Sequence, residues 1–506
     1  MKTIFNILAA IVFTLQLHAQ TPTIVWQNNL GGSNDDFGKS IFKTDDGGII
    51  IAGKTESNDG NVTGNHGGSD CWIIKLDMNY NIEWQKCYGG SDDESAISIV
   101  QTSDNGYVFT GVSLSSDGDL TFNNGGADIW IVKLNPSGDI VWQKSIGGPL
   151  TDIGWHVIET NTGDIVVAGQ LGNPINFNDD KALIIKLNST GVIQWEKYFG
   201  GSLWEDAKHI IQTDDGGFAF VGEAYSTDGD LTGNYGSSDC WVVKLNTEGN
   251  IMWQKNLGGS SFDYAECIIE NSDGSYIMTG YTRSNDFNVS GNHGEIDAWI
   301  VKLSSTGGLI WQKCYGGTEY EKAMCIVNKS NSGYIFSGST NSNNGNVSGL
   351  LGSSDFWIVE IDNTGEIVWQ QCIGGSQEDY SFQIENTGLN EYVLVGVSAS
   401  NDFNVTGNNG VKDYWVVKID TEVGIDENLN LRQVFIYPNP TDGLISIQSK
   451  AKLLIEIRNI LGEKILFKEI YGKCILDISD YPKGVYLVHL RDHNNKTIET
   501  KKIIIN

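Results

Sequence analysis

The chain has 506 residues, a formal net charge of −30 and 61 glycines, and 19% of its residues are charged. From Val434 onward 11 Lys and Arg stand against 8 Asp and Glu, so, allowing +1 for Lys2, the region between carries about −34. We expect no nucleic-acid partner for so acidic a chain, because nucleic-acid binding needs basic side chains that replace phosphate counterions. Cations and neutral partners such as glycans fit this charge better.

The first 19 residues have the pattern of a secretory signal peptide. Lys2 precedes the apolar run Ile7 to Leu17, and the small residue Ala19 precedes Gln20. This order of a basic start, an apolar run and a small residue predicts cleavage after Ala19 and export of the chain. No later stretch approaches the roughly 20 apolar residues of a spanning helix. We therefore expect no transmembrane segment in the mature chain.

Residues 20–420 consist of seven repeats. A Trp-Gln or Trp-Glu pair recurs every 58 residues, except for one interval of 53, and each repeat contains four short β-like runs between Gly, Asp and Asn turns. The tryptophans of these pairs are Trp26, Trp84, Trp142, Trp195, Trp253, Trp311 and Trp369. Four β runs per unit, with no amphipathic helix, predict an all-β fold, a seven-bladed β-propeller with strands a, b, c and d in each blade.

The two ends of the repeat region predict how the ring closes. The last repeat stops after its c run at Trp415 to Ile419, and an unpaired d run, Ile24 to Leu30, lies at the start of the mature chain. Pairing these runs completes the seventh blade and removes two open sheet edges. Seven of the eight cysteines fall at equivalent repeat positions. We interpret them as small core residues, with disulfides possible in an oxidising compartment but not assignable.

One position near the start of strand a is acidic in all seven repeats. The residues are Asp36, Glu94, Asp152, Glu205, Asp263, Glu321 and Asp379. One interpretation is a binding ring around one mouth of the channel, which would hold a cation or a basic partner. The other is a structural role, in which each carboxylate accepts backbone N–H bonds from its own Gly-Gly-Ser turn. Sevenfold recurrence favours the structural role.

The b-to-c loops are rich in Asp, Asn and Gly and are a possible calcium site. Their candidate metal ligands are Asp59, Asp117, Asp119, Asp228 and Asp230. Alternate oxygen ligands suit Ca²⁺, yet the ordered ladder and closing Glu of an EF-hand loop are absent. Asp, Asn and Gly are also ordinary residues of turns that visit positive φ. In blades five and seven, Phe287 and Phe403 stand where the other loops have Gly.

No motif for catalysis is present. His66 and His293 share one loop position but lack the ligand spacing of a zinc motif. Blade three departs from the repeat, with Lys181 for the usual Asp, Leu183 for the usual Trp and a five-residue deletion. An asymmetric site must break the sevenfold pattern, so blade three is where a site would be sought.

The chain after residue 420 has a different character. Residues 421–433 form an expected linker, and residues 434–506 contain short alternating runs that predict a small Ig-like β-sandwich. Within them stand a Tyr-Pro-Asn-Pro opening, a Leu-Gly turn and a Lys-Gly-Val-Tyr segment. The marking residues are Tyr437, Pro438, Asn439, Pro440, Gly462, Gly484 and Tyr486. This ordered set resembles the type A C-terminal sorting domain of the type IX secretion system of Bacteroidetes.

The resemblance implies a route and its partners. The secretion machinery would carry the chain through the periplasm and across the outer membrane, and a sorting peptidase would remove the domain. The protein would then be secreted or held on the outer-membrane surface. For the propeller we hypothesise a non-enzymatic glycan- or protein-binding module on the face that bears the b-to-c loops. The alternative is a polysaccharide-degrading hydrolase or lyase, since carboxylates from distant blades can meet in the fold.

Overall fold

The computed structural model describes residues 22–172, 180–329, 333–421, 435–437, 441, 443–459, 462–479, 481–491 and 497–505. The predicted cleavage residue Ala19 lies outside them, as do Pro438, Asn439 and Pro440 of the sorting motif. The chain divides into two compact units, Met1–Glu422 and Val423–Asn506. Each unit is described by itself below.

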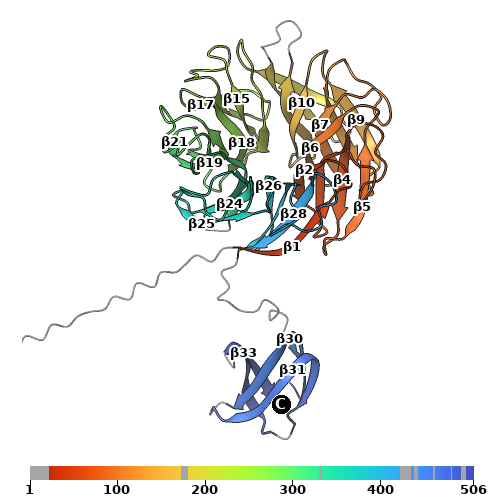
Figure 1. Ribbon diagram of the computed structural model, residues 1–506, viewed down its shortest axis with the longest axis vertical. Coiled ribbons are helices and arrows are strands. Elements are labelled where there is room, and N and C mark those ends of the chain that lie inside the picture. The colour runs from red at the N-terminus through yellow and green to blue at the C-terminus, as the bar shows by residue number, and fades with distance from the viewer. Residues whose placement is uncertain are drawn as a thin grey trace, which may run out of the picture. The chain divides into compact units, whose positions relative to one another are not determined.

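The first unit is a ring of seven antiparallel four-stranded sheets around a common centre (Figure 1). Blade one contains β2 (Asp36–Lys43), β3 (Ile49–Thr55), β4 (Asp70–Leu76) and β5 (Ile82–Tyr88). Blade two contains β6 (Glu94–Gln101), β7 (Tyr107–Ser113), β8 (Asp128–Leu134) and β9 (Ile140–Ile146). Blade three contains β10 (Ile153–Glu159), β11 (Ile165–Leu171), β12 (Lys181–Leu187) and β13 (Ile193–Phe199). Blade four contains β14 (His209–Gln212), β15 (Phe218–Ala224), β16 (Asp239–Leu245) and β17 (Ile251–Leu257).

The remaining blades repeat this order. Blade five contains β18 (Asp263–Glu270), β19 (Tyr276–Thr282), β20 (Asp297–Leu303) and β21 (Leu309–Tyr315). Blade six contains β22 (Glu321–Lys329), β23 (Gly333–Thr340), β24 (Asp355–Ile361) and β25 (Ile367–Ile373). Blade seven contains β26 (Asp379–Gly388), β27 (Glu391–Ser398), β28 (Asp413–Asp420) and the N-terminal strand β1 (Thr23–Leu30). The fold is therefore a seven-bladed β-propeller, as predicted.

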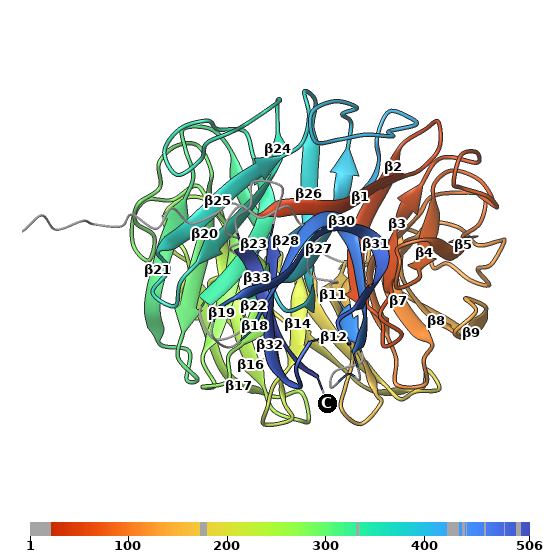
Figure 2. The ribbon, with the colours of Figure 1, turned by 90° about the horizontal axis from the view of Figure 1, so that it is seen from below.

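Strand β1 closes the ring by pairing with β28. The strands are antiparallel, with Ile24 opposite Ile419 and Leu30 opposite Tyr414, and they lie side by side (Figure 2). The seventh blade thus takes one strand from the N-terminal end of the ring and three from the other end. The predicted closure is confirmed, and it protects the edge of β28 from pairing with another chain.

The tryptophans of the c strands form the core between blades. Trp72, Trp130, Trp241, Trp357 and Trp415 are 0% exposed and Trp299 is 1% exposed. Each donates its indole N–H to the Gln of the neighbouring d strand, over 2.6–3.2 Å. Blade three has Leu183 at this position, and there the d strand carries Glu196 in place of Gln. The glutamine acceptor is therefore replaced in the same blade that lacks the tryptophan donor.

A polar belt joins the a strands of neighbouring blades. In six blades a β-bulge interrupts the a strand, as between Gly38 and Ser40 in β2. In five blades the side chain at the Ser40 position accepts a backbone N–H from the next blade, as Ser40 Oγ does from Ile99 at 3.2 Å. In blade six the thiol of Cys325 instead donates to the carbonyl oxygen of Ile384 at 3.6 Å. Gln383 of blade seven accepts the N–H of Ile41 of blade one at 3.0 Å, so the belt also crosses the closing joint.

The second unit is a five-stranded antiparallel sheet around its own core. Its strands are β29 (Phe435–Tyr437), β30 (Leu444–Asn459), β31 (Lys464–Asp477), β32 (Gly484–Arg491) and β33 (Thr497–Ile505). The long strand β30 pairs with β29, β31 and β32. Ile447, Ile457 and Val488 are fully buried in this core. In the part of the chain that the structure describes, no helix is long and apolar enough to span a membrane.

Candidate functional site

The seven repeated acidic residues are buried under their own turns. Their side chains are 0–1% exposed, and each accepts the N–H of the second glycine of the preceding Gly-Gly pair over 2.6–2.8 Å. Asp36 also accepts hydroxyl protons from Thr55 and Ser57. These are the hydrogen bonds that the structural interpretation predicts. A binding role for this acidic ring stays a prediction.

A second set of buried carboxylates, which sequence reasoning missed, lies at the start of the c strands. The residues are Asp70, Asp128, Asp239, Asp297, Asp355 and Asp413, all 0–1% exposed. One oxygen of each accepts the backbone N–H of the residue four positions earlier, over 2.7–3.0 Å. The other oxygen, Oδ1, has no hydrogen-bond partner among the described residues. Their recurrence in six repeats was the available sequence signal.

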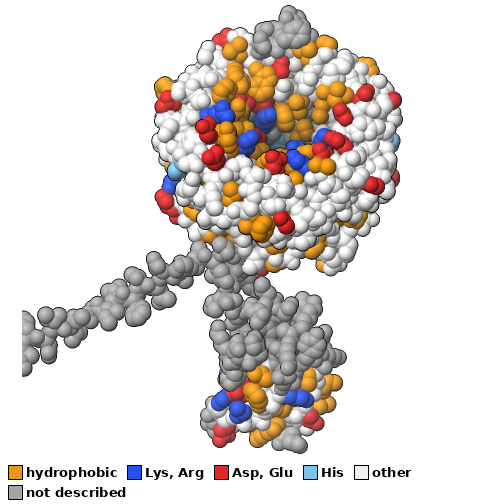
Figure 3. Space-filling model, in the orientation of Figure 1, with side chains coloured by type: hydrophobic (Ala, Val, Ile, Leu, Met, Phe, Trp, Pro, Cys, Tyr) orange, Lys and Arg blue, Asp and Glu red, His pale blue; other side chains and the backbone are white. Residues whose placement is uncertain are grey.

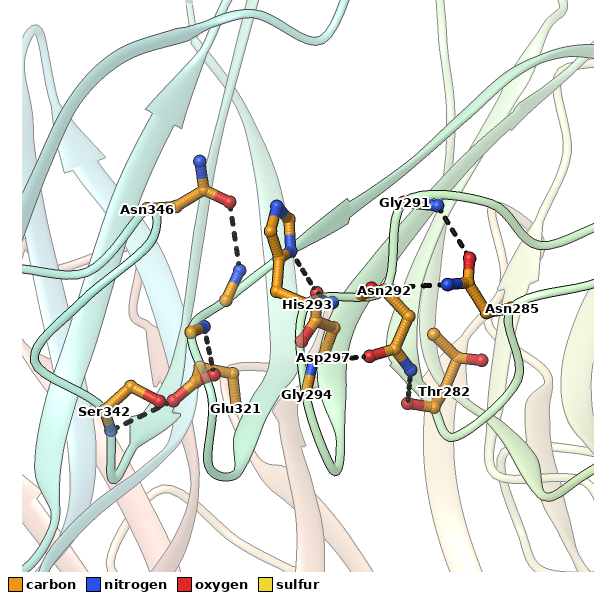
Figure 4. Close-up of polar contacts among 12 residues, drawn as sticks. Thr282, Asn285, Gly291, Asn292, His293, Gly294, Asp297, Glu321, Ser342 and Asn346 are labelled. Atoms are coloured by element: carbon orange, nitrogen blue, oxygen red, sulfur yellow. Dashed lines mark hydrogen bonds and ion pairs between the residues drawn. The ribbon is translucent and has the colours of Figure 1, made fainter.

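The two sets of carboxylates meet at the blade interfaces. A Cβ added to Gly258 would lie 2.4 Å from Asp239 Oδ1 of blade four and 2.7 Å from Asp263 Oδ2 of blade five. Burial, together with the charge of the neighbouring Asp263, raises the pKa of Asp239 to about 7. In blade five the equivalent Asp297 lies between His293 and Glu321 (Figure 4). Only glycine fits between such a pair of carboxylates.

Blade three carries a cation at the corresponding interface. Lys181 replaces the c-strand Asp, and the carbons of its side chain approach Gly200 beside Glu205. Burial raises the pKa of Glu205, while the charge of Lys181 lowers it. The departure of blade three from the repeat is therefore a local compensation of charge at one of seven equivalent interfaces.

The proposed metal ligands of the b-to-c loops tie each loop to the turn beside it. Asp59, Asp117 and Asp228 accept the N–H of Ser33, Ser91 and Ser202 over 2.7–2.8 Å. Asp119 and Asp230 accept the N–H of the first glycine of the turn, over 3.1–3.2 Å. Throughout the described residues, no three His, Cys, Asp or Glu side chains are grouped so as to hold a metal. A calcium site here stays a prediction.

Two exposed phenylalanines occupy a left-handed backbone conformation in these loops. Phe287 has φ 51° and Phe403 has φ 50°, where four other blades have glycines at φ 63–67°. Their side chains are 68% and 67% exposed, and the ring of Phe287 lies 5.2 Å from that of Tyr235 in the next loop. A bulky residue seldom adopts this conformation without a local reason. Burial supplies no such reason here.

The central hollow is lined by residues that differ from blade to blade. On the a strands, the position of Lys39 holds Lys39, Ile97, Trp155, Lys208, Glu266, Met324 and Phe382. Lys39 of blade one and Glu266 of blade five affect each other's pKa, although three or more blade interfaces separate them around the ring. Such an interaction must cross the centre. Figure 3 shows lysines and carboxylates gathered with hydrophobic side chains in this hollow.

Two lysines of this lining lie over aromatic rings of neighbouring blades. Lys208 Nζ lies 3.3 Å from the ring centre of Trp155, and Lys39 Nζ lies 3.6 Å from that of Phe382. Burial, together with the charge of Lys54, lowers the pKa of Lys39 to about 8. The asymmetry that the sequence led us to seek in blade three is spread over the whole hollow. The signal that could have found it is this column of dissimilar residues inside a regular repeat.

Nearer the b-to-c face, tyrosines of blade five form a stack beside the hollow. The rings of Tyr264 and Tyr281 lie 4.5 Å apart at 24°, and Phe262 stacks on Tyr264 at 6.4 Å. Lys322 Nζ of blade six lies 4.6 Å from the centre of the Tyr281 ring. On the blade-four side, Glu223 is 5% exposed. This corner combines aromatic faces, a cation and a carboxyl group.

Two small pockets lie between neighbouring blades, away from the hollow. They have volumes of about 280 and 310 Å³ and equivalent linings from blades five and six and from blades one and two. Each has a histidine whose Nδ1 lies close to a buried Asp, His293 to Asp297 at 2.5 Å and His66 to Asp70 at 2.6 Å. Because equivalent pockets occur at two blade interfaces, we interpret them as a feature of the repeat and not as a single binding site.

Comparison with known proteins identifies the second unit. Residues 435–506 match the secretion system C-terminal sorting domain family. The chain is thus a seven-bladed propeller protein that ends in a type IX secretion sorting domain. This tail marks it as secreted or displayed on the cell surface. No curated protein matches the sequence.

Several solved structures share the general strand arrangement at low identity. A polysaccharide lyase has a TM-score of 0.44 and 8% identity, covering 81% of this chain and 94% of its own. Drosophila Plexin A, in complex with Semaphorin 1b, has a TM-score of 0.43 and 8% identity, covering 79% and 88%. PorZ, a surface component of the type-IX secretion system of Porphyromonas gingivalis, has a TM-score of 0.26 and 11% identity, covering 93% and 81%. None of them bears on the activity of this chain.

Proposed function

We propose that the exported propeller is a non-enzymatic binding module that holds a glycan at the mouth of the central hollow, on the b-to-c face. The observation that carries the proposal is the stack of Tyr264 and Tyr281, with Lys322 over the second ring. It lies where the repeat loses its symmetry. Residues that only stabilise the fold recur from blade to blade. A binding site for one ligand is instead expected to use residues that occur together in one place on the ring.

The chemistry of this corner suits a sugar. Aromatic faces bury the apolar C–H side of a sugar ring, and nearby charged groups hydrogen-bond its hydroxyls, the usual mixture of a ligand site. The ammonium of Lys322 lies over the Tyr281 ring, and its charge lowers the pKa of the carboxyl group of Glu266, so this corner holds a cation near a carboxyl group. Because lysines and carboxylates both line the hollow, the site favours a polar ligand over a purely apolar one.

The exposed rings of the b-to-c loops support the same face. Phe287 and Tyr235 form a second aromatic contact on blades four and five. Phe287 holds a conformation that costs about 1–2 kcal/mol for a residue with a Cβ, and its ring stays in solvent. A cost without a folding benefit is typical of residues kept for recognition. We assign these rings to the outer part of the same binding surface.

A glycan array on the mature chain, with calcium and again with chelator, tests the proposal. We expect retention of a defined polysaccharide class, lost in Tyr264→Ala and kept in Val141→Ala, an exposed site on outer strand β9. Circular dichroism of both variants checks that they fold. A blank array would contradict glycan binding and place a protein ligand first. Loss of the signal in chelator alone would implicate the loop aspartates as calcium ligands.

One observation favours the second candidate, a polysaccharide-degrading enzyme. Burial, together with the charge of the nearby Asp206, raises the pKa of Glu223 to about 7. A carboxyl group with a raised pKa serves as the general acid in many glycan-cleaving sites. Turnover of any polysaccharide that disappears in Glu223→Gln, with binding retained, would favour this candidate. Binding without turnover across a glycan panel would remove it.

A further inference from the structure

Two cysteines of neighbouring blades lie in contact within the polar belt. Cys267 on β18 and Cys325 on β22 hold the same position, 58 residues apart, directly after the β-bulge of their a strands. Their sulfur atoms lie 3.9 Å apart, with the Cys267 thiol donating to Cys325. They are 3% and 8% exposed. The belt, which elsewhere uses Ser, His or Gln to join blades, here places two thiols together.

The surroundings make the two thiols unequal, because donating a hydrogen bond to Cys325, together with burial, raises the pKa of the Cys267 thiol well above its ordinary value. His209, at the same belt position in blade four, has its Nε2 3.8 Å from Cys267 Sγ. Its Nδ1 accepts the backbone N–H of Ile268 at 3.5 Å, so the proton of the neutral ring sits on Nε2 and points to the sulfur. The hydrogen bond from Cys267 lowers the pKa of the Cys325 thiol. Cys325 is therefore the better nucleophile of the two.

We propose that Cys267 and Cys325 form a disulfide that staples blade five to blade six once the chain has been exported. The sorting tail places the protein outside the cell interior, where disulfides form and persist. The sulfurs must approach from 3.9 Å to about 2.05 Å, and the two residues lie on the contacting inner strands β18 and β22. This inference rests on export and on the thiol geometry, independently of any glycan site.

The reaction is an exchange with a small or protein disulfide of the oxidising compartment. The Cys325 thiolate attacks one sulfur of the oxidant, forming a mixed disulfide and releasing the first thiol. Cys267, after losing its proton, then attacks Cys325 Sγ and expels the second thiol. Two cysteine thiols and one oxidant disulfide thus become one protein disulfide and two oxidant thiols, which take up both protons. Since the pair is buried in the finished ring, the exchange belongs to the folding stage.

Mass spectrometry of the full chain tests the staple. The protein is isolated from an oxidising compartment without reductant, denatured, alkylated with iodoacetamide and digested. We expect a Cys267 peptide linked to a Cys325 peptide, lost on reduction, and two fewer alkylated cysteines than the eight found after reduction. Alkylation of both residues before reduction, or a link between other cysteines, would overturn the proposal.

Refolding with a defined oxidant tests whether the disulfide forms in the purified chain, without the compartment from which the protein was isolated. Reduced, denatured full chain refolded with oxidised glutathione is expected to form the same link. Cys372→Ser, a buried cysteine of blade six outside the pair, should retain it, and Cys325→Ser should lose it. Reductant added before heating is expected to lower the melting temperature of the wild type and of Cys372→Ser but not of Cys325→Ser. Equal effects of reductant on all three would also contradict the staple.

Discussion

Trp415 donates its indole N–H to the side-chain oxygen of Gln27 at 2.9 Å, across the joint between the two ends of the ring. The same bond lies inside five other blades, where the partners are 13 residues apart. At the joint it spans 388 residues. The closing sheet therefore reproduces the side-chain contacts of an ordinary blade as well as its backbone pairing.

We predict that Gln27→Met destabilises the propeller by about 1–3 kcal/mol, because it leaves the buried Trp415 N–H without an acceptor. Gln85→Met, within blade one, should cost a similar amount. Glu196→Met is the matched control, since Leu183 has no N–H to satisfy, and it should change the free energy of unfolding by less than about 0.5 kcal/mol. Urea unfolding measures all three. Equal effects in the three variants would show that the bond is not the cause.

The first glycine of each Gly-Gly turn should resist substitution. In Gly258→Ala the new Cβ would meet Asp239 and Asp263 within 2.7 Å, and both carboxylates are fully buried. We expect a loss of about 1–3 kcal/mol through overpacking. Gly148→Ala places its Cβ in open space and should be nearly neutral. Melting temperatures of the two variants check this, and a neutral Gly258→Ala would contradict the crowding.

Stability should fall as pH rises through neutrality. Burial raises the pKa of Asp239 and Asp355 to about 7, so the folded chain keeps protons that the unfolded chain releases near its ordinary value of about 4. The contribution is fully present below the unfolded value and is lost as pH passes the folded value. We expect a melting temperature that declines from about pH 5 to about pH 8.

Asp239→Asn is the corresponding control for the pH effect. Its amide has nearly the shape of the carboxyl group but no longer titrates. The pH dependence of melting should therefore be flatter in this variant, and flatter still when Asp355→Asn is added. Curves parallel to that of the wild type would show that other groups hold the protons.

Replacing Phe287 should separate stability from binding. Phe287→Gly removes the strain of the left-handed conformation and should stabilise the propeller by about 1 kcal/mol, whereas Phe287→Ala keeps a Cβ and should not. Both variants lack the ring and should reduce glycan retention on the array. Thermal melting and array binding are measured on the same preparations. Full retention by either variant would remove Phe287 from the binding surface.

The repeat, the number of blades and the closure by Ile24 to Leu30 could be predicted because each depends on a local pattern and on counting. The tail was identified from its motifs and its short alternating runs, yet 16 consecutive residues there, Leu444–Asn459, form one strand, β30. Alternating patterns mark where a strand can form. They do not show whether two adjacent stretches continue into each other, since that depends on the pairing partners.

The sequence alone therefore determined the architecture and the export route, because periodic β runs and an ordered terminal motif are local properties of the chain. Only the tertiary structure decided that Asp239 meets Asp263, that Lys39 and Glu266 share the central hollow and that Cys267 touches Cys325. Each of these contacts joins residues of different blades. Their geometry depends on how bulges turn the a strands and how seven sheets close into a ring, and sequence spacing does not encode these directions.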